Sequence, residues 1–391
     1  MRKVFAFAAA ALALGCAPLA RADEVKVGVV LHYSGPFAAL GDRIQKGMDL
    51  WMQQHGDSVA GNKITLIKRD AAGSVDTSKR LTQELITRDH VQFIAGYVLT
   101  PEAMAAAPDV TEAKVPTVIL NAATAVITTK SPYLARVSLT LPQTTEIMGT
   151  WAATKGGIKQ AYTAVSDYGP GLDADAAFKL AFTKAGGTVV DTLKFPLMNP
   201  DFAPFLQRIK DSKPQAVYTF IPGGAQPIAF AKTWHDLGLD KAKIKLLPSE
   251  EYGDDADLGK LPETAVGTIM SMHYSSFLKT KTNQDFVAAW HKAYGADSQP
   301  DFFAVQGYDG MALIYDVVAK LNGKIDGDAA MAVIKGWKHD SPRGPIMIDP
   351  ETRDIVQNIY ICKIVKVGGK LQTAVIQTYP MVKDPWKEEH K

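Results

Sequence analysis

Two threonines and one backbone amide are the groups in this chain best placed to hold a carboxylate. Thr100 precedes Pro101, and because proline favours the first turn of a helix, we expect Thr100 to cap a helix with free backbone amides nearby. Thr124 follows a different short apolar segment, two residues after Ala122. Unpaired N–H groups and the positive end of a helix dipole favour an anion at such positions. The spacing therefore predicts a carboxylate site, although hydroxyls that only cap their own helices would give the same pattern.

A glycine-containing turn offers an alternative chemistry. The sequence from Gly169 to Ala174 matches the G-x-G-x-x-A outline of a dinucleotide-binding site, and Asp191 follows at a suitable distance. Three aspartates between residues 167 and 175 place negative charge where a pyrophosphate would sit. We favour a tight turn at the rim of a cleft, from which Tyr168 could contact a ligand. A nucleotide-dependent enzyme remains the remote alternative.

Other catalytic signals are absent from the sequence. It contains no H-E-x-x-H, no G-x-S-x-G and no G-x-x-x-x-G-K-[ST] motif. The 43 Lys and Arg nearly balance the 41 Asp and Glu, so the charge gives no indication of nucleic-acid binding. Two cysteines cannot form a disulfide framework or a four-thiolate metal site. We expect no enzymatic activity, no metal and no other cofactor.

Residues 1–22 have the pattern of a secretory signal peptide. Arg2 and Lys3 precede an uncharged apolar run that is too short to span a bilayer, and Ala20-Arg21-Ala22 is an A-x-A cleavage site. We therefore expect export to the periplasm, with lipidation of Cys16 as the less favoured alternative. After cleavage the chain would be close to neutral. Its remaining cysteine, Cys362, lies in a strand-like run and is expected to be buried and inert.

Strands and helices alternate along the rest of the chain. Continuous apolar runs predict buried strands, and apolar residues at helical spacing predict the helices between them. The strands are expected at about 25–31, 63–69, 91–95, 117–120, 161–166, 189–195, 215–221 and 243–247. The helices are expected at about 41–54, 77–89, 101–113, 142–156, 171–185, 201–212, 225–237, 286–294, 301–322 and 328–337. Residues 346–379 favour two or three strands with a hairpin turn at Gly368-Gly369.

This alternation predicts an α/β fold with doubly wound parallel sheets. Two such sheets are expected, because a chain of 391 residues is long enough for two hydrophobic cores. We place lobe 1 at 23–141 and lobe 2 at 142–272, with 273–343 returning to lobe 1 and 344–391 forming the C-terminal strands with lobe 2. Several crossings between the lobes make a hinge. The loops after the strands should face the cleft, where ligands of such sheets bind.

The order of these segments resembles the type I periplasmic binding proteins of the branched-chain amino acid (Leu/Ile/Val) class, the solute receptors of ABC importers. The matching stretches are Val27 to Val30, Ser34-Gly35-Pro36, Gly41, Gly47, Asp70, residues 89–96, Val115-Pro116, Tyr168-Gly169 with Gly171, and Tyr308-Asp309. The resemblance implies a Venus-flytrap fold with a three-segment hinge. It also implies delivery of a small solute to a permease in the inner membrane. We expect a monomer, although the sequence itself does not determine the oligomeric state. A sensory receptor domain is a further alternative, which a membrane-spanning segment after residue 22 would favour.

The resemblance also implies site residues in lobe 1. The carboxylate-binding positions of the family match Thr100, Ala122 and Thr124, and a position that lines the pocket matches Leu40. In lobe 2 it matches Tyr168, and it matches Glu250 to the acidic residue that receives a ligand ammonium.

One departure from the family pattern bears on the ligand. Amino-acid binders usually have an aromatic residue where this chain has Pro222-Gly223-Gly224, which leaves room for a larger and flatter ligand. Tyr97, Tyr168 and Phe303 could offer ring faces for stacking, although Phe303 fits a core position equally well. We therefore favour an aromatic or related hydrophobic carboxylate, with leucine, isoleucine or valine as the alternative.

Overall fold

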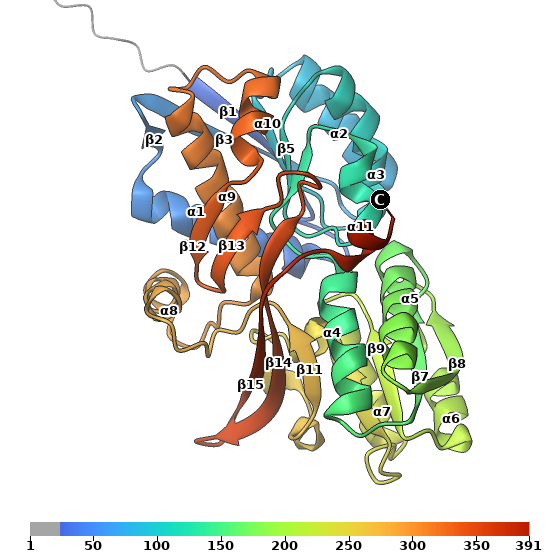
Figure 1. Ribbon diagram of the computed structural model, residues 1–391. Coiled ribbons are helices and arrows are strands. Elements are labelled where there is room, and N and C mark those ends of the chain that lie inside the picture. Colours follow the sequence, from blue (N-terminus) through green and yellow to red (C-terminus); the bar gives the residue numbers. More distant parts are fainter. Residues whose placement is uncertain (1–23, 391) are drawn as a thin grey trace, which may run out of the picture.

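The computed structural model describes residues 24–390, which form two lobes arranged one above the other (Figure 1). The expected signal peptide and Cys16 lie outside these residues. The predicted α/β class is confirmed, because each lobe is built on a largely parallel sheet with helices on both faces. Within residues 24–390, no helix combines the length and the apolar character needed to cross a membrane.

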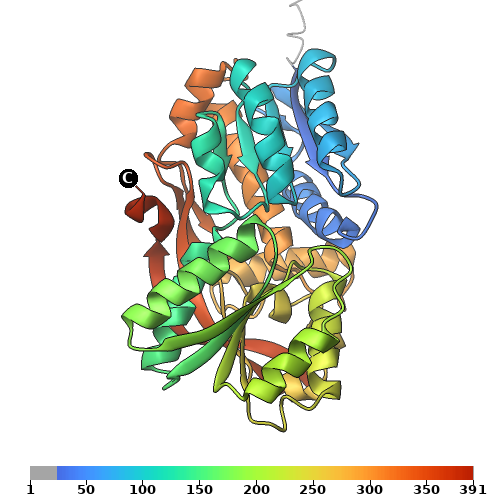
Figure 2. The ribbon, with the colours of Figure 1, turned by 90° about the vertical axis from the view of Figure 1, so that its right-hand side faces the viewer.

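Lobe 1 contains a six-stranded sheet in the order β2-β3-β1-β4-β5-β6, in which only β2 is antiparallel to its neighbour. Its strands are β1 (Glu24–Leu31), β2 (Ser58–Val59), β3 (Asn62–Asp70), β4 (Phe93–Gly96), β5 (Thr117–Ile119) and β6 (Leu134–Arg136). One face packs on α1 (Ala38–His55) and α9 (Phe302–Lys320), and the other on α2 (Val75–Thr87) and α3 (Thr100–Glu112) (Figure 2). The alternation along β1 produces these two layers, since Val29 and Val30 belong to different cores.

Lobe 2 contains a four-stranded parallel sheet in the order β10-β9-β7-β8. Its strands are β7 (Gln160–Ser166), β8 (Thr188–Phe195), β9 (Ala216–Phe220) and β10 (Lys245–Pro248). The helices α4 (Leu141–Thr154) and α5 (Gly169–Lys184) pack together on one face, and α6 (Ala203–Ser212) and α7 (Ala225–Asp236) on the other (Figure 2). The two lobes thus repeat one architecture.

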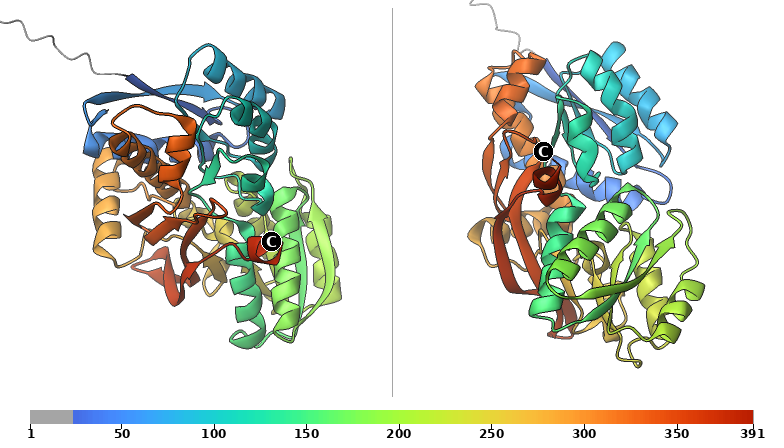
Figure 3. Two further views of the ribbon diagram at one scale, coloured as in Figure 1. Left: turned by 45° about the horizontal axis from the view of Figure 1, so that its top comes forward. Right: turned by 45° about the vertical axis from the view of Figure 1, so that its right-hand side comes forward.

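A third, antiparallel sheet connects the lobes. It consists of β11 (Ile269–Met272), β12 (Lys338–Ser341), β13 (Gly344–Ile348), β14 (Ile355–Val367) and β15 (Lys370–Val382). β12 and β13 lie below lobe 1, and the hairpin of β14 and β15 runs along lobe 2 (Figure 3). The hairpin turns at Gly368-Gly369, as predicted. The remaining helices are α8 (Lys281–Tyr294), α10 (Gly327–Ile334) and α11 (Pro385–Glu389). The residue boundaries proposed for the lobes remain a prediction.

The predicted elements are present with shifted ends. Helix α2 begins earlier than expected, because the Ser74 hydroxyl accepts a hydrogen bond from the amide of Thr77 and caps the helix. The strands β6 and β12 lie outside the predicted ranges, because each includes charged residues and neither shows a continuous apolar run. Cys362 is buried in β14, as expected.

Two glycines allow α1 and α9 to touch backbone to backbone. A Cβ atom at Gly47 would lie 1.9 Å from the carbonyl oxygen of Ala304. A Cβ atom at Gly307 would lie 2.0 Å from the carbonyl oxygen of Ile44. This close contact sets where the N-terminal ends of both helices meet the cleft.

We expect Gly307→Ala to lower the free energy of unfolding by about 1–3 kcal/mol, because the new methyl group must push two helix backbones apart. Alanine's higher helix propensity, about 1 kcal/mol, offsets only part of this cost. Urea unfolding followed by circular dichroism measures the change. Gly259→Ala is the control, since a Cβ atom there meets nothing within 4 Å. Equal stability of Gly307→Ala and wild type would contradict this packing.

Candidate ligand-binding site

A cavity lies between the lobes at the C-terminal ends of the parallel strands. It contains about 370 Å³ free of protein atoms, its open mouth included. Lobe 1 lines it with Leu40, Val98, Leu99, Thr100, Asn121, Ala123, Leu139 and Phe303. Lobe 2 lines it with Tyr168, Pro170, Phe220, Pro222, Gly223 and Glu251. Most of these residues lie in loops that follow β4, β5, β7, β9 and β10, which is where ligands of open parallel sheets bind.

The hydroxyl groups of Thr100 and Thr124 lie 2.8 Å apart and share a hydrogen bond. Neither caps its own helix. Thr100 is the first helical residue of α3, and the extended residue Leu99 is the N-cap, so the expected capping by Thr100 is wrong. The Glu102 side chain accepts the hydrogen bond from the Leu99 amide instead. Thr100 lines the cavity, whereas Thr124 is not among the lining residues and reaches its edge only through the hydrogen bond to Thr100. The Thr124 amide also donates to the Thr100 hydroxyl, at 3.4 Å.

Ala122, Tyr97 and Glu250 are placed away from the cavity. The amide of Ala122 already donates to the carbonyl oxygen of Tyr97 at 3.1 Å, and Ala123 lines the cavity instead. Tyr97 has a left-handed backbone with φ of 64°, and its hydroxyl is paired with Thr82 in the core beneath α2. The Glu250 carboxylate accepts from the amide of His273 at 2.9 Å and is turned toward the hinge.

Flat apolar surfaces form the walls of the cavity. The rings of Tyr168 and Phe220 stack with centroids 6.0 Å apart and an interplanar angle of 29°. On the other side, Phe303 packs against Gly223, where a Cβ atom would lie 2.7 Å from the Phe303 ring. A larger residue at position 223 could not occupy this arrangement. Sequence reasoning missed Phe220, because the last residue of a buried strand looks like core.

The lobes touch each other across the cleft. The carboxylate of Asp173 on α5 accepts a hydrogen bond at 2.7 Å from the amide of Ala125, which begins a short 3-10 helix (Ala125–Lys130) of lobe 1. A Cβ atom at Gly169 would lie 2.5 Å from the Thr124 hydroxyl.

A Cβ atom at Gly171 would lie 1.9 Å from the carbonyl oxygen of Ser166. Close packing therefore accounts for the glycines that resemble a dinucleotide motif.

An arginine in α1 joins lobe 1 to the loop after β10. One guanidinium nitrogen of Arg43 lies 2.6 Å from Asp254 and 3.0 Å from Asp301, and the other lies 2.8 Å from Asp257. Burial raises the pKa of Asp254, and the nearby Asp301 carboxylate adds to this effect. The cluster fixes the segment that carries Glu250 and Glu251.

Glu250 and Glu251 are neighbouring acids in a low-dielectric environment. Burial raises the pKa of Glu250 to about 8. Burial, and then the charge of Glu250, raise the pKa of Glu251 to about 8 as well. His273 has its pKa lowered by burial and by the charge of Arg343, so a neutral imidazole lies beside Glu250. The residue that faces the cavity is Glu251, one position from the residue matched by resemblance.

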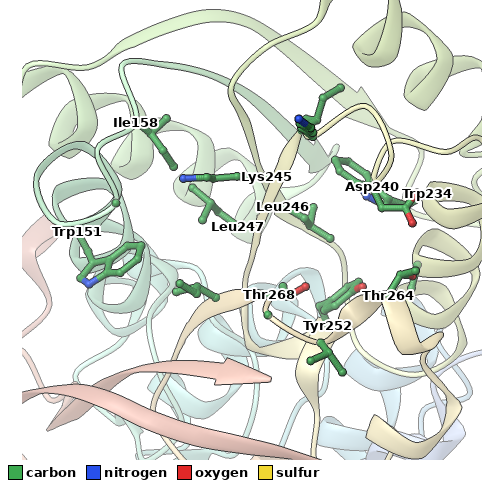
Figure 4. Close-up of a pocket in the computed structure, with 17 residues that line it drawn as sticks. Trp151, Ile158, Trp234, Asp240, Lys245, Leu246, Leu247, Tyr252, Thr264 and Thr268 are labelled. Carbon is green, nitrogen blue, oxygen red and sulfur yellow. The ribbon is translucent and has the colours of Figure 1, made fainter. Parts of the chain in front are cut away.

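A second, larger cavity lies at the far end of lobe 2 (Figure 4). The sheets of β10 and β11 separate there, being joined by the single bridge between Ser249 and Ser271. Trp151 and Trp234 lie on opposite sides of this cavity, with residues of β10 between them. Its walls come from one side of the hinge, so a ligand there could not draw the lobes together. We therefore place the functional site in the cleft.

Two α/β lobes that close over an aromatic-walled cleft define a hinged binding protein. The periplasmic binding protein family matches residues 24–370, and the chain belongs to this family, in its branched-chain amino acid ABC transporter class. The family and the type I fold predicted from the sequence are therefore confirmed. Both are those of substrate-binding proteins.

Relatives cover almost the whole chain. Leu/Ile/Val-binding protein homolog 6 of Brucella melitensis biotype 1 is 41% identical over 387 residues, 98% of this chain and 99% of the relative. A solute-binding protein of an ABC transporter from Rhodopseudomonas palustris BisB5, in complex with 3,4-dihydroxybenzoic acid, is 48% identical. It covers 93% of this chain and 99% of its own, with a TM-score of 0.91. A second, from strain HaA2 in complex with p-hydroxybenzoic acid, is 40% identical over 94% of this chain and 100% of its own, with a TM-score of 0.91.

The raised pKa of Glu250 predicts that stability falls as pH rises. The folded state holds the Glu250 proton more tightly than the unfolded chain, in which the pKa of this carboxyl group is 4.5. The stabilisation that this proton gives to the folded state is therefore fully present below about pH 4.5 and is lost as pH rises through about 8. Glu250→Gln keeps an acceptor for the His273 amide and removes the titration. We expect a smaller loss of unfolding free energy between pH 5 and pH 8 than in wild type, measured by urea unfolding at a series of pH values.

Glu112→Gln is the control for this measurement, since it removes one exposed carboxylate from the end of α3. It should leave the pH dependence of wild type. An unchanged pH dependence in Glu250→Gln would show that this carboxyl group titrates alike in the folded and unfolded states.

Proposed function

We propose that this protein is the extracytoplasmic solute-binding component of an ABC importer, and that it captures a small aromatic carboxylate by closure of its lobes. The observation that carries this proposal is the shape and chemistry of the cleft. The hydroxyl of Thr100, which is hydrogen-bonded to that of Thr124, lies at one edge, and the Tyr168–Phe220 stack and Phe303 form flat walls. Planar rings bury a large apolar area between such walls, and a carboxylate accepts hydrogen bonds from hydroxyls.

The similar proteins from Rhodopseudomonas palustris support an aromatic acid as the ligand. The structures of both proteins contain a hydroxylated benzoic acid. The two proteins are 48% and 40% identical to this chain. The alternative ligand is a branched-chain amino acid, which the name of the Brucella relative favours. An amino acid brings an ammonium group that needs an ionised carboxylate, whereas the acid in this cavity is Glu251, whose neutral form is favoured by burial.

The remaining proposals follow from this role. We infer that the protein acts in the periplasm after loss of residues 1–22, as a monomer that delivers its ligand to an inner-membrane permease and binds no nucleic acid. We also infer that it performs no catalysis. In the glycine turn, Asp173 is engaged by the amide of Ala125 and Gly169 abuts Thr124, so the closed arrangement has no room there for a pyrophosphate.

Removal of either threonine hydroxyl should weaken binding of the carboxylate. We expect Thr100→Ala and Thr124→Ala each to raise the Kd of 4-hydroxybenzoate. The binding free energy should weaken by about 1–3 kcal/mol, because a buried carboxylate would lose one donor. Isothermal titration calorimetry against 4-hydroxybenzoate, benzoate and leucine measures this and ranks the ligand classes.

Thr154→Ala is the matched control. Its hydroxyl bonds only the carbonyl oxygen of Thr150, at the exposed end of α4, and its loss should leave the affinity unchanged. Full affinity in both Thr100→Ala and Thr124→Ala would remove the carboxylate site from this edge of the cleft.

A bulky residue at position 169 should hinder closure without unfolding either lobe. The gap between Gly169 and the Thr124 hydroxyl has no space for a side chain. We expect Gly169→Val to raise the ligand Kd, because overpacking in the closed state should weaken the binding free energy by about 1–3 kcal/mol. The free energy of unfolding should change little. Small-angle X-ray scattering should show a smaller ligand-induced decrease in radius of gyration than in wild type. Gly259→Val, in open space, should close normally, and a normal decrease in Gly169→Val would contradict the assigned contact.

A further inference from the structure

The Glu251 carboxyl group is an unexplained feature of the cleft. The residue lines the cavity, yet it is only 8% exposed. Its Oε2 atom is buried and has no hydrogen-bond partner among residues 24–390. Buried polar atoms in folded proteins nearly always have a partner, so an unpaired oxygen at a cavity wall indicates that the partner belongs to the ligand.

Glu251 is on the opposite lobe from the two threonine hydroxyls. It follows β10 in lobe 2, whereas Thr100 and Thr124 follow β4 and β5 in lobe 1. The stacked rings of Tyr168 and Phe220 belong to the same lobe as Glu251. A ligand that binds both lobes can therefore place its carboxylate on lobe 1 and a second polar group against Glu251.

The chemistry of that second group follows from the protonation of Glu251. Burial and the adjacent Glu250 raise its pKa to about 8, so it is mostly a neutral acid at pH 7. A neutral carboxyl group both donates and accepts hydrogen bonds, as does a phenol. It gives little attraction to an ammonium, and it spares an anionic ligand the repulsion of a second negative charge.

We propose that Glu251 reads a ring hydroxyl and thereby makes this protein selective for hydroxylated aromatic carboxylates over unsubstituted ones. This inference rests on the proposed function, since it assumes that the cleft binds an aromatic acid. It assigns the selectivity to one side chain of lobe 2, whose apolar neighbours would accept substituted and unsubstituted rings alike.

The experiment compares two ligands and three variants by isothermal titration calorimetry. The ligands are 4-hydroxybenzoate and benzoate, and the variants are Glu251→Gln, Glu251→Leu and the control Glu112→Gln. We expect Glu251→Leu to weaken 4-hydroxybenzoate binding by about 10- to 100-fold and to leave benzoate binding unchanged or stronger. Glu251→Gln keeps a donor and an acceptor, so it should retain most of the preference for the hydroxylated ring. Glu112→Gln should also retain it, because it removes one exposed carboxylate at the end of α3 that is not part of the cavity.

The pH dependence separates a phenol from an ammonium as the partner. Wild-type affinity for 4-hydroxybenzoate should fall as pH rises from 7 toward 9, because Glu251 ionises beside an anionic ligand, and the fall should be smaller in Glu251→Gln. Binding of leucine that strengthens over the same range would instead indicate an ammonium at Glu251 and would overturn the proposal.

The outcomes distinguish the inference from the proposed function. If wild type binds neither aromatic acid, the proposed function fails and the inference fails with it. If wild type binds both and Glu251→Leu weakens them equally, the cleft binds aromatic acids but Glu251 does not read the hydroxyl. A loss confined to 4-hydroxybenzoate supports the inference.

Discussion

The buried guanidinium of Arg343 is the interaction on which the geometry of the hinge depends. It is fully buried and bonds to Asp309 in α9, to the carbonyl oxygens of Val137 and Ser138, and to Gln357 in β14. These partners come from the return helix, the crossing from β6 to α4, and the connecting sheet. A buried cation is tolerated only when its donors are satisfied, so these segments must keep fixed positions around it.

The same charge acts on Glu250, the neighbour of the cavity-lining Glu251. Arg343 lowers the pKa of Glu250 against the larger effect of burial, and it lowers that of His273. Glu250 is held by the His273 amide and turned toward the hinge. Because Glu250 begins a 3-10 turn (Glu250–Gly253), its neighbour Glu251 points in a different direction and lines the cavity. The hinge thus decides which of two adjacent acids meets the ligand.

Much of this arrangement could be predicted from the sequence, because position after a strand places a residue at the cleft. Thr100, Tyr168 and Pro222 follow strands and line the cavity, and so do Leu40 and Phe303 in the first turns of α1 and α9. Thr124 was predicted with them but is not among the lining residues. The failures have local causes that no period or motif contains. A left-handed backbone at position 97 turns a tyrosine into the core, and a single hydrogen bond occupies the amide at position 122. The choice between residues 250 and 251 depends on one backbone turn, which matching by resemblance does not resolve.

The glycines of the cleft explain how a ligand can control closure. At Gly169 and Gly223 the backbone of lobe 2 lies directly against the side chains of Thr124 and Phe303 of lobe 1. The Ala125 amide donates a hydrogen bond to the Asp173 carboxylate across the same face. Burial raises the pKa of Asp173, so keeping its carboxylate ionised in the closed state costs free energy. The contact through Asp173 is therefore partly opposed by desolvation. A ligand shifts the equilibrium only through contacts that it makes in the closed state, and a flat acid held by both lobes supplies them.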